Sequence, residues 1–358
     1  MDGLGRINLL VGTNNSGKTS VLEAIHLLAA SGDPYVLWQM LWRRGERLPA
    51  SPMQGEEPAR RVEVDVASVF HGYDAQPGVR TRIQGTTKGI LPRWIECTVV
   101  SEVPDQKTLF ETEVEISATP RLALQVTGSP PYPPLSPISL TLPLTRRGGL
   151  LADPLDPWER RGRRQHDATY FVTTASLSVD ELIAMWNNVA LTPSEDLVLS
   201  ALRVLDPKIE RIAVQAPTSV RLSSGQTRGG FIVKHRDFSQ PVPIGSMGDG
   251  MWRMLVLALV TTQCKGGVLL VDEVDTGLHY TVMAQMWKLL FHAAKEFDVQ
   301  VFATTHSSDC IYSLAEAGKR ADRENAISVQ RIDASKKHSV PYDQDEIAVA
   351  AAKEIEVR

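Results

Sequence analysis

A stretch near the N-terminus has the residue types and spacing of a phosphate-binding loop. Residues 12–19, Gly-Thr-Asn-Asn-Ser-Gly-Lys-Thr, match the pattern G-x-x-x-x-G-K-S/T. Gly12 and Gly17 let the backbone curl so that successive N–H groups face phosphate oxygens. Lys18 can reach the β- and γ-phosphates, and the hydroxyl of Thr19 can ligate Mg²⁺. The nucleotide-binding candidates are Asn14, Asn15, Ser16, Gly17, Lys18, Thr19 and Ser20.

Two carboxylates later in the chain can complete such a site. Residues 267–271, Gly-Val-Leu-Leu-Val, form an apolar run that Asp272 and Glu273 follow directly. A continuous apolar run predicts a strand covered on both faces, as in a parallel sheet. At its carboxyl end Asp272 would hold Mg²⁺ through its water shell, and Glu273 would orient or deprotonate an attacking water. The pair therefore predicts hydrolysis of the bound nucleotide.

A histidine ends the next apolar run. Residues 281–297 have the pattern of a helix and residues 299–305 that of another buried strand. Together with the carboxylate strand they predict a right-handed crossover unit. His306 would then lie at the carboxyl end of a sheet strand, where open α/β sheets bind their ligands. We expect it to hydrogen-bond the γ-phosphate.

The phosphate loop itself has a strand before it and a helix after it. Residues 6–11 are mostly apolar and predict a buried strand. Residues 20–30 predict a helix with an apolar side, and Gly32 stands where a C-terminal cap belongs. A helix that begins at the loop turns its positive N-terminal end toward the phosphates.

Two serine motifs compete for contact with the γ-phosphate held by a facing subunit. We call such a motif a signature. It must begin a helix, because its serine hydroxyl and backbone N–H groups bind the γ-phosphate at a helix N-terminus. Residues 222–226, Leu-Ser-Ser-Gly-Gln, run into a predicted strand, whereas residues 246–250 precede an apolar helix predicted over 251–263. We therefore interpret residues 222–226 as a decoy. The signature residues are Ser246, Gly248, Asp249 and Gly250.

Short strands predict an antiparallel sheet inserted between the two halves of the site. Most of these segments alternate between polar and apolar residues, and turns separate them. They cover residues 79–84, 94–100, 112–117 and 121–127. An amphipathic helix is predicted before them, over residues 35–47.

Two capping boxes predict a helical hairpin in the second half of the chain. Ser178 and Glu181 form the first box, and Thr192 and Glu195 form the second, with Pro193 at the first helical position. A strand is predicted ahead of the hairpin, and others follow it. These strands cover residues 169–174, 209–215, 220–223 and 230–235.

A segment rich in proline and arginine follows the predicted sheet. Residues 128–144 are rich in proline and predict an extended or irregular segment. Arginines then gather at Arg160, Arg161, Arg163 and Arg164, diluted by nearby acids. Two interpretations stay open, a solvated connector and a contact with DNA.

Bulk composition narrows the class of protein. The chain has 358 residues, 43% of them hydrophobic, and a formal net charge of -4, so its overall charge does not attract nucleic acid. Its three cysteines are widely spaced, which suits reduced thiols. No signal peptide is evident, and the longest apolar stretch, residues 251–260, is too short for a bilayer and contains Arg253. We expect a cytoplasmic protein without a membrane partner.

Taken together, these motifs resemble the ABC/SMC-like ATPases. The order of phosphate loop, β lobe, Ser-x-Gly-x-Gly helix, Asp-Glu strand and Thr-His-Ser strand carries the resemblance over nearly the whole chain. Within that group, residues 11–25, 245–250 and 272–279 look like those of OLD-type, RecF-like AAA ATPases. The resemblance implies ATP as the nucleotide, Glu273 as catalytic base and His306 as switch histidine. The loop that crosses to the partner subunit would include Asp275, Thr276 and Gly277.

The expected fold is α/β, a P-loop NTPase of the ABC-type ATPase head with an inserted antiparallel β lobe and a helical hairpin. Residues 1–60 and 166–340 would form the ATPase core. Residues 61–165 would form the inserted lobe with its connector, and residues 341–358 a C-terminal tail helix.

The chain departs from the OLD-type pattern at both ends. Relatives usually begin with a strand pair ahead of the segment that here starts at Gly3. OLD nucleases continue into a Toprim nuclease domain, for which residues 307–358 are too few. Asp343 and Asp345 imitate one Toprim element without the glutamate strand that should precede it. The resemblance thus implies an ATPase without nuclease activity of its own.

Three functional hypotheses follow. The favoured one is an ATPase that dimerises, or forms a higher oligomer, around ATP and controls a separately encoded effector, such as a nuclease in antiviral defence. The second is a RecF/SMC-like ATPase of DNA repair or chromosomes, with DNA as partner. The third is a sensor that binds ATP without hydrolysing it, and the presence of Glu273 argues against it.

Overall fold

The chain folds into two compact units. The computed structural model describes residues 1–48, 63–86, 92–102, 121–129, 137–145, 147–151, 169–173, 177–215, 230–318 and 327–353. The first unit combines Met1–Leu22 with Asp167–Arg358, and the second covers Glu23–His166. Helix α1 (Lys18–Ala29) begins in the first unit and ends in the second. Residues 1–60 are expected in the ATPase core, whereas the second unit begins at Glu23.

A six-stranded sheet forms the centre of the first unit. Its strand order is β15-β14-β1-β13-β12-β8. Neighbouring strands run parallel except that β15 is antiparallel to β14. The predicted α/β class is confirmed. The strands are β1 (Ile7–Val11), β8 (Thr169–Val172), β12 (Val268–Val271), β13 (Gln300–Thr304), β14 (Ile327–Arg331) and β15 (Val340–Tyr342).

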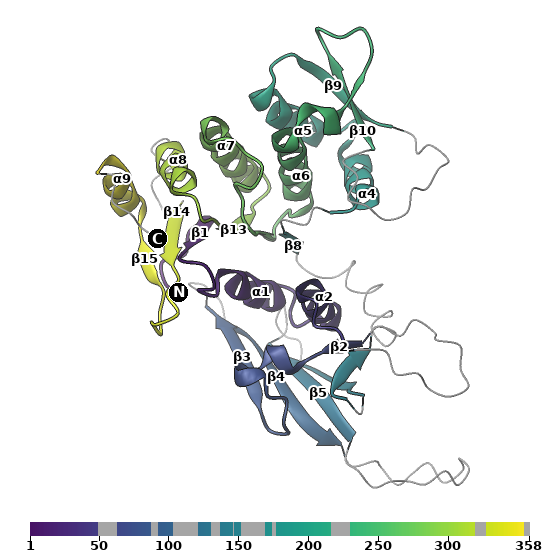
Figure 1. Ribbon diagram of the computed structural model, residues 1–358, viewed down its shortest axis with the longest axis vertical. Coiled ribbons are helices and arrows are strands. Elements are labelled where there is room, and N and C mark those ends of the chain that lie inside the picture. The colour runs from purple at the N-terminus through teal and green to yellow at the C-terminus, as the bar shows by residue number, and fades with distance from the viewer. Residues whose placement is uncertain are drawn as a thin grey trace, which may run out of the picture. The chain divides into compact units, whose positions relative to one another are not determined.

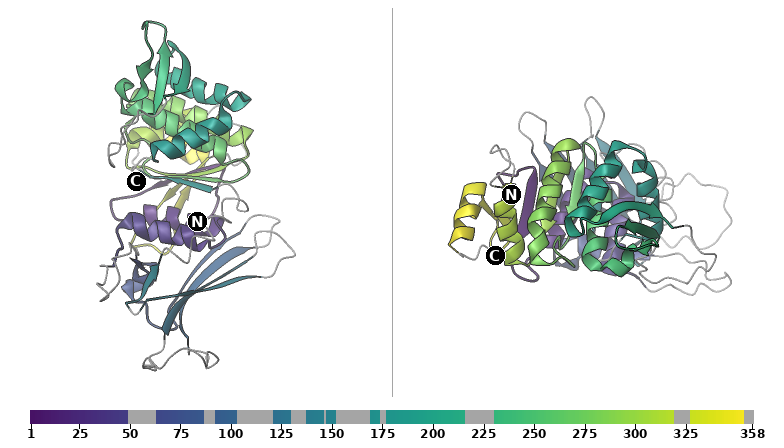
Figure 2. Two further views of the ribbon diagram at one scale, coloured as in Figure 1. Left: turned by 90° about the vertical axis from the view of Figure 1, so that its right-hand side faces the viewer. Right: turned by 90° about the horizontal axis from the view of Figure 1, so that it is seen from above.

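Four helices of the first unit stand in a row over one face of this sheet, as Figures 1 and 2 show. They are α6 (Asp249–Gln263), α7 (Tyr280–Glu296), α8 (Ser308–Gly318) and α9 (Gln344–Ala352). Helix α6 is buried along nearly its whole length, which agrees with a sequence that is apolar on every side. No helix in the described part of the chain is long and apolar enough to cross a membrane.

The predicted helical hairpin is confirmed as α4 (Val179–Val189) and α5 (Pro193–Leu205). At α4 the capping box is complete, because Ser178 and Glu181 each accept a hydrogen bond from the other's backbone N–H. At α5 neither half of the predicted box is present, because Thr192 Oγ1 accepts from Ser194 N at 3.3 Å and not from Glu195 N. The carboxylate of Glu195 accepts from Leu191 N, one residue earlier, at 2.6 Å. Leu191 itself has a left-handed backbone conformation, with a φ of 62°.

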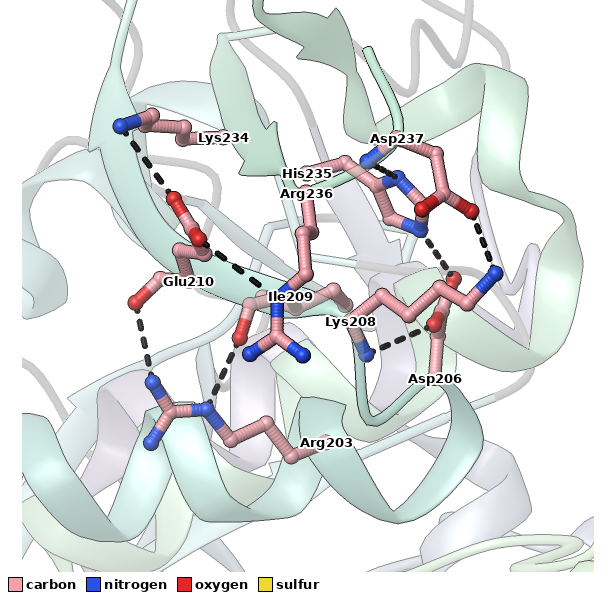
Figure 3. Close-up of polar contacts among 9 residues, drawn as sticks. All are labelled: Arg203, Asp206, Lys208, Ile209, Glu210, Lys234, His235, Arg236 and Asp237. Atoms are coloured by element: carbon pink, nitrogen blue, oxygen red, sulfur yellow. Dashed lines mark hydrogen bonds and ion pairs between the residues drawn. The ribbon is translucent and has the colours of Figure 1, made fainter.

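A small sheet follows the hairpin, with the order β11-β10-β9. Its strands are β9 (Ile209–Val214), β10 (Phe231–His235) and β11 (Val242–Pro243). Polar contacts join β9, β10 and the end of α5, among them a 3.2 Å ion pair between Lys234 and Glu210 (Figure 3). The strand predicted over residues 220–223 lies outside the described residues.

The second unit contains the predicted antiparallel sheet. Its order is β3-β4-β5-β6, and a two-stranded pair, β2 with β7, accompanies it. One face packs in an apolar core with α2 (Pro34–Arg44), including Ile95, Cys97 and Val99. The strands are β2 (Glu63–Asp65), β3 (Arg80–Gly85), β4 (Arg93–Glu102), β5 (Arg121–Gly128), β6 (Ile138–Pro143) and β7 (Gly149–Leu151).

Two segments of this unit differ from expectation. Helix α2 ends at Arg44 rather than Arg47, because Gly45 takes a left-handed conformation with φ 78° and caps the helix. Part of the proline-rich segment is regular, since β6 pairs with β5 and places Leu140 and Leu142 on its apolar face. The predicted strand at residues 112–117 and the arginines Arg160, Arg161, Arg163 and Arg164 lie outside the described residues.

Candidate nucleotide site

Three neighbouring parallel strands bring the predicted motifs to one edge of the sheet. Strand β13 lies between β1 and β12. In register, Leu10 of β1 pairs with Thr304 and Val271 of β12 pairs with Ala303. The phosphate loop leaves β1, the acids Asp272 and Glu273 leave β12, and His306 follows β13, all at the carboxyl ends. This is the edge at which open α/β sheets bind ligands.

The phosphate loop has the backbone that its glycines were expected to permit. Gly12 has φ 147° and Gly17 φ 95°. A Cβ on Gly12 would lie 2.3 Å from the carbonyl oxygen of Ile332, so no larger residue fits there. The hydroxyl of Ser16 is buried and has no hydrogen-bond partner among the described residues. A phosphate or a metal-bound water is a suitable partner for a hydroxyl in this position.

Lys18 begins α1 and folds back over the loop. Its Nζ donates to the carbonyl oxygens of Gly12 at 2.9 Å and Thr13 at 2.8 Å. Burial lowers the pKa of Lys18, and the negative charges of Asp272 and Glu273 oppose that shift. The amine therefore lies within the electrostatic reach of both acids.

The hydroxyl of Thr19 and the carboxylate of Asp272 form an oxygen site. Thr19 Oγ1 lies 3.3 Å from Oδ1 and 3.2 Å from Oδ2 of Asp272. Mg²⁺ prefers hard oxygen ligands and commonly uses one or two carboxylates together with substrate phosphates. The two side chains, with the unpartnered hydroxyl of Ser16 nearby in the loop, therefore fit Mg²⁺.

Glu273 is held in an unusual backbone conformation. Its φ is 46°, in the left-handed region that side chains with a Cβ rarely adopt. Its N–H donates to Thr304 Oγ1 at 2.8 Å, and its carboxylate accepts from Thr276 Oγ1 at 3.1 Å. Thr304 Oγ1 in turn donates to Asp272 Oδ1 at 2.6 Å. One hydroxyl on the middle strand thus orients both acids.

Arg253 of α6 lies behind the acids. Its guanidinium donates to Thr173 O at 3.2 Å, Asp272 O at 3.0 Å and Glu273 O at 2.9 Å. Burial lowers the pKa of Arg253 to about 10, against the opposing influence of the acids at positions 275, 272 and 273, so the group stays charged at neutral pH. It is only 6% exposed.

The predicted signature lies against the loop that follows β12. Ser246 is exposed in a short 3₁₀ turn, and α6 begins at Asp249 with Gly248 as its N-cap. A Cβ on Gly250 would lie 3.2 Å from Gly277 O, and one on Gly277 3.3 Å from Asp249 Cβ. The loop is also anchored directly after β13, because Thr305 Oγ1 donates to the carboxylate of Asp275 at 2.6 Å.

The remaining predicted residues fall into three groups. Asn14, Asn15, Ser20 and His306 are exposed. Asp343 caps α9, where its carboxylate accepts from the backbone N–H groups of Asp345 and Glu346, so it has a structural role there. The rival motif at residues 222–226 lies outside the described residues.

Two contributors to the site were not identified from sequence, Arg253 and Thr304. Each left a signal. Arg253 is the only charged residue in the apolar stretch 251–260, and a buried charge requires a partner. Thr304 ends an apolar strand directly ahead of Thr305 and His306, but the sequence alone drew attention to the histidine.

The chain is similar in sequence to several known proteins. Residues 142–309 match a family described as "AAA domain, putative AbiEii toxin, Type IV TA system". A protein of Helicobacter pylori named ATP/GTP phosphatase is 20% identical over 343 residues, covering 90% of this chain and 85% of that protein. An uncharacterized protein of Methanocaldococcus jannaschii is 33% identical over 87 residues, covering 24% of this chain and 76% of that protein.

Similar solved structures include SMC heads. The structure of the Smc head bound to the C-winged helix domain of ScpA covers 96% of this chain and 92% of its own, at 14% identity and a TM-score of 0.44. The SMC head domain from Thermotoga maritima covers 94% of this chain and 90% of its own, at 11% identity and a TM-score of 0.37. The phosphate loop, the carboxylate strand and the AAA domain matched over residues 142–309 make the chain similar to P-loop ATPases of the AAA group.

Proposed function

We propose that this protein hydrolyses ATP in a site shared between two copies of the chain and uses that cycle to control a separately encoded effector. The observation that carries the hydrolysis is the pair of acids beside the phosphate loop. Thr19 and Asp272 are within 3.3 Å of each other, and Glu273 is the adjacent acid on the same edge. The name of the Helicobacter pylori relative, ATP/GTP phosphatase, supports the same chemistry.

The residues divide the work of phosphoryl transfer. Backbone N–H groups of residues 13–18 and the positive end of α1 would bind the phosphates, and Lys18 would neutralise the β- and γ-phosphates. Thr19 and Asp272 would hold Mg²⁺, which would add positive charge beside the phosphate oxygens. Glu273 would accept a proton from the attacking water. His306, exposed at the end of β13, would donate a hydrogen bond to the γ-phosphate.

The signature residues support a shared site. Ser246 and Gly248 precede α6 and Asp249 begins it, and all three are exposed although most of that helix is buried. In the described part of the chain no hydrogen bond joins Ser246 to the phosphate loop. A second copy would supply Ser246 and the N-terminus of α6 to the γ-phosphate. Asp275, Thr276 and Gly277 would cross the same interface.

The effector is proposed from family alone. The matched family is described by a putative AbiEii toxin and a type IV toxin–antitoxin system. We place this chain in a defence system in which ATP binding and hydrolysis release or restrain a partner, and we assign the nuclease activity to that partner. The division into an ATPase core and an inserted β lobe belongs to this proposal, with the lobe as a docking element.

The test is ATP hydrolysis by purified variants. Glu273→Gln should lower kcat about 10²- to 10⁴-fold, the range of general base catalysis, while ATP binding is retained. Lys18→Ala should lose ATP binding itself. Glu316→Gln, which changes an exposed acid of α8, is the matched control and should hydrolyse like the wild type. Wild-type turnover by Glu273→Gln would show that another group activates the water.

A further inference from the structure

A buried arginine in the first turns of α6 has no explanation in packing. Arg253 lies in a run of residues, from Met251 to Thr261, that are all buried. Burying a guanidinium is unfavourable unless hydrogen bonds replace its water. Its Nε has no partner among the described residues, so the compensation comes from its two terminal nitrogens. The partners of those nitrogens indicate what the residue does.

All three partners are backbone carbonyls at the carboxyl ends of β8 and β12. The ladder between these strands ends where Asp272 N donates to Val172 O at 2.8 Å. Beyond that point the carbonyls of Thr173, Asp272 and Glu273 accept from Arg253, and Glu273 O also accepts from Thr276 N at 3.0 Å. The planar guanidinium of arginine presents several donors at fixed angles and can therefore bind several carbonyls at once. The ammonium group of lysine lacks this fixed geometry.

The peptide that Arg253 holds is the strained one. Glu273 has φ 46°, and its N–H is bonded on the other side by Thr304 of β13. The N–H of Glu273 is therefore fixed by the side chain of Thr304, and its C=O by the side chain of Arg253 together with the backbone N–H of Thr276. A left-handed residue with a Cβ persists only where its surroundings enforce that conformation.

Arg253 also lies one helical turn from the exposed signature. Asp249, four residues earlier on α6, packs against Gly277 of the loop that follows Glu273. A shift of the N-terminus of α6 would therefore move the guanidinium and the Glu273 carbonyl together. We propose that Arg253 is a positioning residue, an inference that rests on the proposed function. Arg253 holds Glu273 in its catalytic orientation and links that orientation to the N-terminus of α6, next to Ser246.

The experiment compares Arg253→Lys and Arg253→Met with the wild type. Both should lower kcat about 10- to 100-fold, as expected for a misplaced base, while the affinity for ATP and the midpoint of unfolding stay close to wild type. Arg253→Lys keeps the positive charge but removes the planar set of guanidinium donors, so it tests whether that geometry is needed. It also keeps the comparison possible if Arg253→Met does not fold.

The chain supplies a matched control in Arg203 of α5. Its Nε donates to Ile209 O at 2.9 Å and its Nη2 to Glu210 O at 3.0 Å (Figure 3). Arg203→Lys thus breaks the same kind of guanidinium contact with strand carbonyls at the small sheet, and its kcat should remain that of the wild type.

Hydrogen exchange decides the inference without reference to hydrolysis. The amides of Glu273 and Val274, bonded to Thr304 Oγ1 and Thr304 O, should exchange about 10-fold faster in Arg253→Lys, while those of β10 should not change.

Unchanged exchange at Glu273, or wild-type kcat in Arg253→Lys, would overturn the proposal. Exchange that rises over all of α6, with loss of stability, would reduce Arg253 to a packing residue. If the wild type itself fails to hydrolyse ATP, the proposed function is wrong, and the exchange result still decides the role of Arg253.

Discussion

At the scale of single residues, hydroxyls do much of the orientation in this site. Thr304 is only 1% exposed, and its one oxygen accepts from Glu273 N and donates to Asp272 Oδ1. Thr276 and Thr19 each bond one carboxylate as well. Because an acid must stand at a fixed angle to its substrate, the hydroxyl on the middle strand matters more than its small size suggests.

Replacing that hydroxyl should therefore cost activity. Thr304→Val keeps the volume but leaves the N–H of Glu273 unsatisfied, and we expect kcat to fall about 10- to 100-fold. Thr304→Ser keeps the oxygen and should hydrolyse ATP at close to the wild-type rate. Thr261→Val is the matched control, since Thr261 is equally buried and its hydroxyl bonds only Leu257 O of its own helix. Steady-state hydrolysis over a range of Mg²⁺ concentrations makes the comparison, and equal rates for the Val and Ser variants at position 304 would contradict it.

At the scale of elements, α6 connects an exposed end to a buried one. It begins at Asp249 beside the exposed turn that contains Ser246, and from Met251 onward it is buried against the sheet. A rigid helix with these two ends can carry a displacement from a partner surface toward the acids. The exposed serine is therefore expected to act on hydrolysis without contacting its own phosphate loop.

A bulky charged side chain at position 246, next to the N-terminus of α6, should affect ATP hydrolysis but not ATP binding. Ser246→Arg should retain ATP binding, because the phosphate loop of the same chain is untouched, but should lose most of its turnover. Ser224→Arg, in the rival motif, should be nearly silent. Nucleotide binding and hydrolysis measured on the same preparations give the answer. The opposite ranking of the two variants would identify residues 222–226 as the signature.

At the scale of the whole molecule, the proposed site requires two chains. Lys18 would come from one copy and Ser246 from the other, so each variant damages a different half. A mixture of Lys18→Ala and Ser246→Arg contains pairs with one complete site. We expect each variant alone to be inactive and the mixture to recover hydrolysis, measured with ATP and Mg²⁺ at several mixing ratios. A mixture as inactive as its parts would indicate that each chain hydrolyses ATP alone.

Local features of the first unit were predictable because they depend on neighbouring residues. The phosphate loop needs glycine where φ is 147° and 95°, and the capping box of Ser178 and Glu181 closes within one turn. Continuous apolar runs marked β12 and β13 as buried parallel strands. These patterns also placed Lys18, Asp272 and Glu273 at strand and helix ends.

Residue types and spacing predict which side chains bear the chemistry, whereas contacts between distant segments hold those side chains in place. Thr304 contacts Asp272 across 32 positions in the chain, which is possible because β13 lies between β1 and β12. Arg253 reaches Thr173 across 80 positions, since α6 packs over the ends of β8 and β12. Residue patterns report backbone conformation and burial over a few turns, whereas strand order and helix packing depend on contacts between distant segments. The orientation of the acids depends on those distant contacts together with the local contact of Thr276 with Glu273.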